Sequence, residues 1–181
     1  MQAYRLVPHP TKPPLGVSSI EARIDMGHPH WVQARWRIET SGALKWPPPA
    51  GQRRRDGLWK TTCFEIFVKS EGNFTYREFN LSPSEGWNVY DFDTYREGMR
   101  EPPVQQAPVC TMRPGGRFAI FDAAVPRSLV PRGPSSLGLS AVIEEEGGIK
   151  SYWAIAHPDA PVPDFHHAAC FAGTLLPPQE A

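Results

Sequence analysis

Hydrophobic and polar residues alternate along much of this chain, in short runs that end at Gly, Pro, Asn or Ser. Three such runs follow one another in the middle of the sequence, at residues 62–69, 74–82 and 87–93. Alternation with a period of two, together with many β-branched and aromatic residues, predicts β-strands. Residues 71–73 and 83–86 are expected to join these strands, because Gly and Asn accept the positive φ of tight turns.

The period of two also predicts which residues share a face of this meander. Opposed residues of an antiparallel pair point to the same side, so a slip of one residue would exchange the two faces. With loops of even length, one face is expected to be apolar and to belong to the core: Phe64, Ile66, Val68, Phe79, Leu81, Tyr90 and Phe92. The other face is expected to gather three acids and an amide among aromatic residues: Cys63, Glu65, Phe67, Glu78, Asn80, Ser82, Trp87, Val89 and Asp91.

The same patterns predict strands on both sides of the meander. They cover residues 4–7 (an edge strand), 18–26, 31–40, 104–112, 117–125, 137–144, 149–156 and 165–176. A long loop with three consecutive prolines is expected at 44–56, one helical turn at 95–99, and a tail from Pro177. Many short strands without an amphipathic helix favour a β-sandwich or barrel. We expect an all-β, single-domain antiparallel β-sandwich over residues 1–181, with few or no helices.

Composition narrows the class of protein without identifying its function. The 19 basic and 19 acidic residues give a formal charge of zero, which argues against nucleic acid or an anionic membrane as partner. The 21 prolines cluster between the expected strands, as in a β domain with rigid loops. The three cysteines, Cys63, Cys110 and Cys170, are too sparse for a disulfide framework or a zinc cluster. We therefore expect a soluble protein of a reducing compartment, the cytoplasm.

Three segments of the chain resemble a known family. They read GLWKTTCFEIFV, YREFNLSPSEGWNVYDFDTYREGM, and SYWAIAHP followed by PDFHH, and they extend roughly from Trp59 to Phe171. These motifs are similar to those of the bacterial DOMON-like family, which is akin to carbohydrate-binding module family 9. The resemblance implies a small β-sandwich of jelly-roll type that binds sugar or haem without catalysis.

The resemblance also implies a role for two tryptophans. In sugar-binding relatives, a Trp precedes a strand of the form Asp-x-x-Glu-apolar-Phe, and a second Trp on a late strand completes an aromatic clamp. Trp59 and residues 62–67 match this pattern, with Thr62 in the position of the Asp. Trp153 is the candidate for the second Trp of the clamp.

We therefore expect a non-catalytic module that binds a small polar ligand, a saccharide or a cell-wall-derived sugar. A pyranose has apolar C–H faces and a rim of hydroxyl groups, so it needs a flat aromatic surface with hydrogen-bonding groups at the edge. Trp59 and Trp153 are expected to stack on the sugar. The groups expected to hydrogen-bond to it or to border its pocket are Glu65, Glu78, Asn80, Arg96, His157 and His166. No metal and no cofactor is expected.

Two other classes of function stay open. A haem-binding or redox module, the other function that the resemblance implies, would take axial ligands from Met26, Met99 or Met112 together with a histidine or a lysine. The chain has no Cys-x-x-Cys-His motif for covalent attachment of haem. A structural or protein-interaction domain would instead keep its tryptophans in the core and its strand acids in water.

Catalysis and metal binding are weaker interpretations of the same residues. Cys63 could serve as a nucleophile, but a lone Cys in an apolar strand is usually buried and inert. Glu65 and Glu78 would form a glycosidase pair only at a separation of roughly 5–9 Å. The segment AHPDAPVPDFHH holds possible metal ligands without a known spacing: His157, Asp159, Asp164, His166 and His167.

Overall fold

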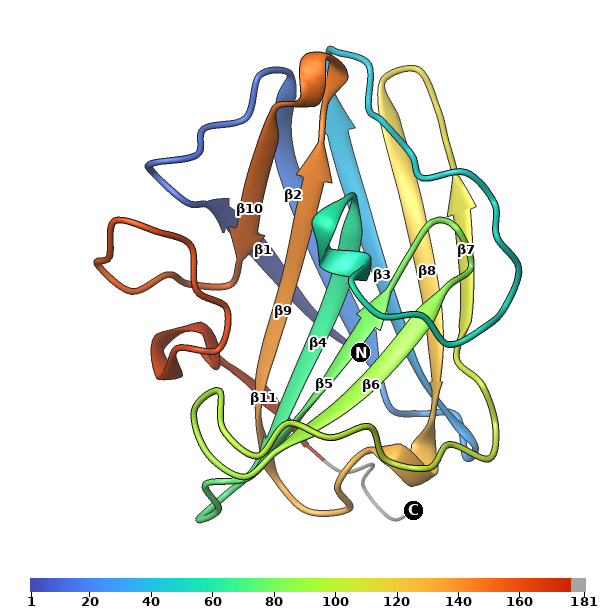
Figure 1. Cartoon of the computed structure of the whole chain (residues 1–181), viewed down its shortest axis with the longest axis vertical. Helices are drawn as coiled ribbons and strands as arrows, with labels where there is room; N and C mark the ends of the chain where they lie inside the picture. The colour runs from blue at the N-terminus through green and yellow to red at the C-terminus, as the bar shows by residue number, and fades with distance from the viewer. Residues whose placement is uncertain (177–181) are drawn as a thin grey trace.

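The computed structural model describes residues 1–176, and this part of the chain is built from β-strands and short 3-10 turns (Figure 1). The strands are β1 (Gln2–Pro8), β2 (Val17–Asp25), β3 (Trp31–Thr40), β4 (Cys63–Ser70), β5 (Tyr76–Leu81), β6 (Trp87–Phe92), β7 (Val109–Arg113), β8 (Phe118–Pro126), β9 (Ser135–Glu144), β10 (Lys150–Ala154) and β11 (Gly173–Leu175). The 3-10 turns are η1 (Leu58–Lys60), η2 (Arg127–Leu129), η3 (Glu146–Gly148) and η4 (Ala168–Cys170). The predicted all-β class is confirmed, and the tail predicted from Pro177 lies outside the described residues.

The strands form two layers that share β1. Their order is β6-β5-β4-β9-β10-β1-β2-β3-β8-β7, with β11 beside β9, and every pair is antiparallel. Strand β1 pairs with β2 along most of its length, whereas Val7 and Pro8 pair with β10. In Figure 1, the front sheet (β4, β5, β6, β9, β10 and β11) lies before the back sheet (β1, β2, β3, β7 and β8). This is the predicted sandwich, although β1 is an inner strand and not an edge.

The core between the sheets is built around three aromatic side chains. Phe64 of the front sheet stacks on Phe121 of the back sheet, with ring centroids 4.2 Å apart. Trp36 packs against both rings, and none of the three side chains is exposed. Removing large apolar side chains from water provides the main driving force for such a core, at about 25 cal/mol per Å² of apolar surface.

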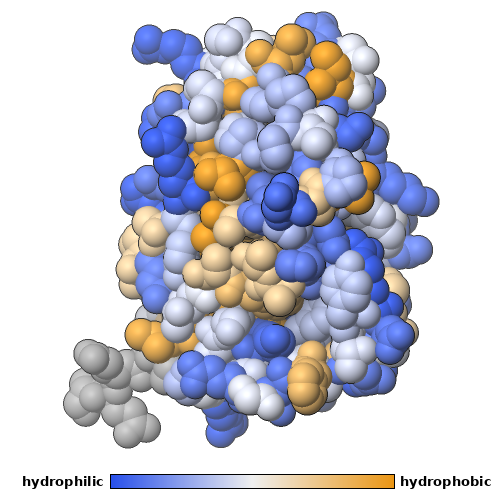
Figure 2. Space-filling model, turned by 90° about the vertical axis from the view of Figure 1, so that its left-hand side faces the viewer, coloured by the Kyte–Doolittle hydropathy of each residue, from blue (hydrophilic) through white to orange (hydrophobic). Residues whose placement is uncertain are grey.

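A second, smaller cluster covers the outer face of the front sheet. It consists of Phe67, Tyr76, Tyr90, Phe92, Val142, Ala154 and Phe165. Because residues 155–172 fold back over this face, β4 is buried on both sides along most of its length. Seen from the side of β10, the surface carries an apolar patch surrounded by hydrophilic residues (Figure 2). The outer face of the front sheet is therefore an interior surface, on which buried polar groups need partners.

The predicted register of β4 and β5 is confirmed. Glu65 lies opposite Asn80, and Phe67 lies opposite Glu78. Since opposed residues share a face, both acids and the amide point away from the main core, toward the second cluster. The alternation in these two strands was sufficient to place them.

The predicted register of β6 was wrong by one residue. The paired residues Leu81 and Trp87 are separated by residues 82–86, an odd number, whereas a four-residue loop had been expected. The loop closes with a hydrogen bond from Glu85 N–H to the carbonyl of Ser82, and Glu85 adopts a φ of 69°. The shift exchanges the two faces of β6 for Trp87, Val89, Tyr90, Asp91 and Phe92.

Some predicted element boundaries also differ. Residues 95–99 do not form a helical turn, because Arg96 and Gly98 adopt positive φ values of 57° and 68°. Strand β7 begins only at Val109, since prolines in residues 102–108 remove backbone donors. Of the predicted strand at 165–176, only β11 pairs with the sheet.

The long loop at residues 44–56 is confirmed as lacking regular strands or helices. Part of it nevertheless lies along the free edge of β6. The N–H of Arg55 donates to the carbonyl of Trp87, and the N–H of Trp87 donates to the carbonyl of Arg53. The loop thereby covers a sheet edge that would otherwise expose unpaired backbone groups. No helix in residues 1–176 has the length and apolar character needed to cross a membrane.

Replacing Phe121 by Ala is expected to destabilise the protein by about 3–5 kcal/mol, because it leaves a cavity between Phe64 and Trp36. The matched control is Phe118→Ala on the same strand, where the ring is 45% exposed. This control should cost about 1 kcal/mol or less. Urea unfolding monitored by tryptophan fluorescence measures both losses, and equal losses would contradict the proposed core.

Candidate functional site

A pocket of about 320 Å³ opens on the outer face of the front sheet. Strands β4, β5, β6, β9 and β10 form its floor, and η1 and two loops, residues 93–100 and 155–172, supply its walls. Its aromatic lining consists of Trp59, Tyr90, Phe92, Tyr152 and Phe165. Its polar lining consists of Glu65, Glu78, Arg96 and His166. The pocket thus combines flat apolar surfaces with hydrogen-bonding groups.

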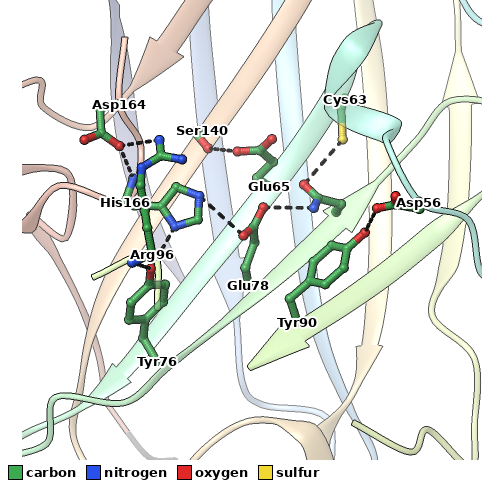
Figure 3. A network of polar contacts seen from close by, with 11 residues as sticks. Asp56, Cys63, Glu65, Tyr76, Glu78, Tyr90, Arg96, Ser140, Asp164 and His166 are labelled. Atoms are coloured by element: carbon green, nitrogen blue, oxygen red, sulfur yellow. Dashed lines mark hydrogen bonds and ion pairs between the residues drawn. The ribbon is translucent and has the colours of Figure 1, made fainter. Parts of the chain in front are cut away.

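Two buried acids lie at the floor of the pocket, on neighbouring strands (Figure 3). Glu65 is 3% exposed and accepts a hydrogen bond of 3.0 Å from the Ser140 hydroxyl. Glu78 is 6% exposed and accepts a hydrogen bond of 2.8 Å from the Asn80 amide. Within residues 1–176, no Lys or Arg forms an ion pair with either carboxyl group.

Burial shifts the protonation of both acids. It raises the pKa of Glu65 well above the usual range, and the neighbouring Glu78 carboxylate raises it further. Burial also raises the pKa of Glu78 to about 7, although the Asn80 hydrogen bond and the Arg96 charge act in the opposite direction. At neutral pH the two carboxyl groups therefore retain at least one proton between them.

A chain of polar contacts leads from Glu78 to the loop that carries Arg96 (Figure 3). The backbone N–H of Arg96 donates to the Tyr76 hydroxyl, which lies 2.8 Å from His166 Nδ1. The hydroxyl donates its proton to Nδ1 in the tautomer in which Nε2 carries the ring proton. The other ring nitrogen, Nε2, faces the Glu78 carboxyl at 3.6 Å. Burial lowers the pKa of His166 to about 4, so the ring is neutral at pH 7.

Asp164 ties the two loops of the pocket together. Its carboxylate binds the Arg96 guanidinium at 2.7 Å and accepts a hydrogen bond from the Tyr95 hydroxyl. Burial alone would raise the pKa of Asp164, but the hydrogen bonds from Tyr95 and Arg96 outweigh it and the pKa is lowered. The positive charge of Arg96 is therefore engaged by Asp164 and not by the acids on the pocket floor.

Trp59 forms the rim of the pocket opposite these loops. Gly57, with a φ of 71°, precedes η1, and this left-handed conformation turns the chain before the tryptophan. The indole is 37% exposed and meets the ring of Tyr90 edge-on, with centroids 6.1 Å apart. The Tyr90 hydroxyl in turn donates to Asp56 at 2.6 Å, which holds this aromatic pair in place.

The structure brings together five of the eight residues singled out from the sequence. They line one pocket, and they are Trp59, Glu65, Glu78, Arg96 and His166. Asn80 is fully buried on the same face. Its amide N–H donates a hydrogen bond to Glu78, and its amide oxygen accepts one from the Cys63 thiol. It therefore supports Glu78 without lining the pocket.

The expected clamp of two tryptophans does not form. Trp153 is 2% exposed, lies in the core between the sheets, and donates its indole N–H to the Ser151 hydroxyl at 2.9 Å. Its neighbour Tyr152 points to the opposite face and lines the pocket. His157 also lies away from the pocket, because its ring binds the Val7 carbonyl.

Four aromatic residues of the lining were missed by the sequence analysis. Tyr90 and Phe92 had been assigned to the core, owing to the error in the β6 register. Tyr152 and Phe165 were not considered. The signal that could have identified Tyr152 is its position next to Trp153, because successive residues of a strand face opposite sides.

The chemistry of the site does not fit a nucleophilic cysteine. Of the groups named for haem, Met99 lines the pocket, whereas Met26 is buried in the main core and both ring nitrogens of His166 face partners in the polar network. Cys63 is fully buried, and burial raises the pKa of its thiol well above the usual range, which suppresses the reactive thiolate. Within the part of the chain that the structure describes, no three His, Cys, Asp or Glu side chains are placed to hold a metal ion.

Comparisons with known proteins give matches in structure alone. No family model and no curated protein sequence matches the chain. A candidate carbohydrate-binding protein from Bacteroides uniformis superposes with a TM-score of 0.65 at 15% identity, over 96% of this chain and 84% of its own. A family 9 carbohydrate-binding module from Caldicellulosiruptor kristjanssonii, solved with glucose, gives 0.55 at 6% identity, over 90% of this chain and 78% of its own. At these identities the likeness establishes that the chain shares their fold.

Proposed function

We propose that this protein is a non-catalytic saccharide-binding module whose ligand occupies the pocket on the outer face of the front sheet. The observation that carries the proposal is the lining of that pocket. Aromatic rings such as Trp59 and Tyr152 offer apolar surface to the C–H faces of a sugar. Glu65, Glu78 and Arg96 offer hydrogen-bonding groups to its hydroxyls.

The size of the pocket and the fold support the same proposal. Its volume of about 320 Å³ lies near the lower end of the usual range for small-molecule sites, roughly 300–1,000 Å³. A ligand of one or two sugar rings is therefore expected. The shared fold adds support, since the Caldicellulosiruptor module was solved with glucose. Membership of the DOMON-like family and a cytoplasmic location, suggested by the motifs and by three unpaired cysteines, belong to this proposal.

Replacing Trp59 by Ala is expected to weaken saccharide binding by roughly ten- to a hundredfold, because it removes the exposed aromatic rim of the pocket. Isothermal titration with a panel of mono- and disaccharides measures the loss. Trp31→Ala is the matched control, since Trp31 is a half-buried tryptophan of the back sheet. If no saccharide binds the wild-type protein, or if Trp59→Ala binds as tightly as wild type, the proposal fails.

The buried acids should make stability depend on pH. The folded protein holds the Glu78 proton up to about pH 7, whereas an unfolded glutamate releases it near pH 4.3. Between these values the folded state binds more protons, so this group lowers the free energy of unfolding as pH rises. Glu78→Gln should remove that loss, and its advantage over wild type should grow by on the order of 1–3 kcal/mol from pH 5 to pH 8.

The measurement is a series of urea denaturation curves from pH 5 to pH 8, with Glu97→Gln as the control. Glu97 is exposed and does not line the pocket, so its variant should follow the wild-type curve. The quantity to compare is the difference in the free energy of unfolding between Glu78→Gln and wild type at each pH. The lowered pKa of His166 makes the free energy of unfolding rise with pH, and this contribution is the same in both proteins and cancels. An advantage of Glu78→Gln that is constant with pH would contradict the raised pKa.

A further inference from the structure

The acids on the pocket floor have free acceptor capacity, and within residues 1–176 neither forms an ion pair with a Lys or Arg. Glu65 uses Oε2 for the hydrogen bond from Ser140, and within residues 1–176 no donor reaches Oε1. Among the described residues, Glu78 Oε2 meets only the neutral ring of His166, at 3.6 Å. Both side chains are more than nine-tenths buried and line the pocket. Such groups normally have full sets of partners, so part of the set is expected from a ligand.

The charges around the acids also leave room for one cation. Arg96 is paired with Asp164, so these two groups cancel. His166 is neutral, because its pKa is lowered to about 4. Burial raises the pKa of the remaining titratable neighbours and keeps them uncharged near neutral pH, and these neighbours are Cys63, Tyr76 and Tyr90. Tyr95 is hydrogen-bonded to Asp164, and Tyr152 lies on the pocket wall.

The walls favour a cation as well as a sugar ring. Trp59, Tyr90, Phe92, Tyr152 and Phe165 line the pocket. The faces of aromatic rings carry partial negative charge and attract ammonium groups, an interaction worth roughly 0.5–2 kcal/mol. The same faces pack against the C–H groups of a pyranose. A pocket with this combination suits a ligand that has both a ring and a positive charge.

We propose that the ligand is an amino sugar of the hexosamine class, whose free ammonium group lies against the carboxyl groups of Glu65 and Glu78. This inference rests on the proposed saccharide function and names the class of substrate. An ammonium group has three donors, two of which can pair with the free Oε1 of Glu65 and the Oε2 of Glu78. A neutral sugar leaves the buried acids without a counter-charge, and N-acetylation of the amine removes the charge that they would bind.

The test is isothermal titration of the wild-type protein at pH 7 with D-glucosamine, D-galactosamine, D-glucose and N-acetyl-D-glucosamine. At least one free amino sugar is expected to bind about tenfold or more tightly than the neutral sugars, since charge-assisted hydrogen bonds to buried carboxylates are strong. Binding of the ammonium should release a proton from the acids. The apparent heat should therefore depend on the ionisation enthalpy of the buffer, and the affinity should rise from pH 5 to pH 7.

Glu65→Gln tests the same point by mutation. This variant keeps the shape of the side chain and removes the carboxyl group that could ionise when an ammonium group binds, so the preference for the amino sugar should fall to about threefold or less. Glu97→Gln removes an exposed charge outside the pocket and should keep the full preference. Circular dichroism of each variant checks the fold, and should Glu65→Gln be unfolded, the buffer dependence of the wild-type heat decides.

Three outcomes would overturn the inference. Tighter binding of D-glucose than of either amino sugar, or a binding heat that is the same in all buffers, would refute the amino-sugar class while the saccharide function stands. Ethanolamine binding as tightly as the amino sugars would show that the site selects a simple amine. If none of the sugars binds, the proposed function is overturned, and this inference with it.

Discussion

The pairing of β4 with β5 is the constraint on which the site depends. Successive residues of a strand face opposite sides, so packing Phe64 into the main core forces Glu65 onto the outer face of the front sheet. The register then places Asn80 opposite Glu65, and Glu78 one pair further along the same face. Changing this register by one residue would turn the acids into the main core, where nothing could solvate them.

The outer face becomes a pocket because loops cover it. Residues 155–172 pack Phe165 onto the sheet, and the ion pair between Arg96 and Asp164 joins them to residues 93–100. The same coverage desolvates Glu65 and Glu78, which is the main cause of their raised pKa values. Burial of the acids and formation of the pocket are therefore consequences of a single structural arrangement.

The support of the site comes from groups that a ligand would not touch. Ser140 and Asn80 orient the two carboxyl groups, and the Tyr76 hydroxyl holds the ring of His166 through Nδ1. Each of these three partners lies on a strand of the front sheet. The pocket floor is consequently held by paired strands, whereas its two loop walls depend on the contacts of Asp164.

The sequence could predict the sandwich and the polar face of β4 and β5, because acids alternate there with large apolar residues. In β6 the segment WNVYDF carries large apolar or aromatic residues at both parities, so the length of the loop before it decided the register. The same ambiguity holds for Tyr152 and Trp153, adjacent aromatic residues of which only the contacts identify the one in the core. Residues 155–172 have no strand periodicity, and nothing in their sequence separates His166, in the pocket, from His157, outside it.

The most direct test is to locate the surface that a bound saccharide occupies. A two-dimensional ¹H–¹⁵N NMR titration identifies this surface. With a saturating saccharide, the largest shift changes are expected at the Trp59 indole N–H and at the backbone amides of residues 95–100 and 164–167. The outer face of the back sheet offers an alternative groove, lined by Arg23, Arg35 and Asp122. Shift changes confined to that groove, with the Trp59 signal unmoved, would contradict the central claim.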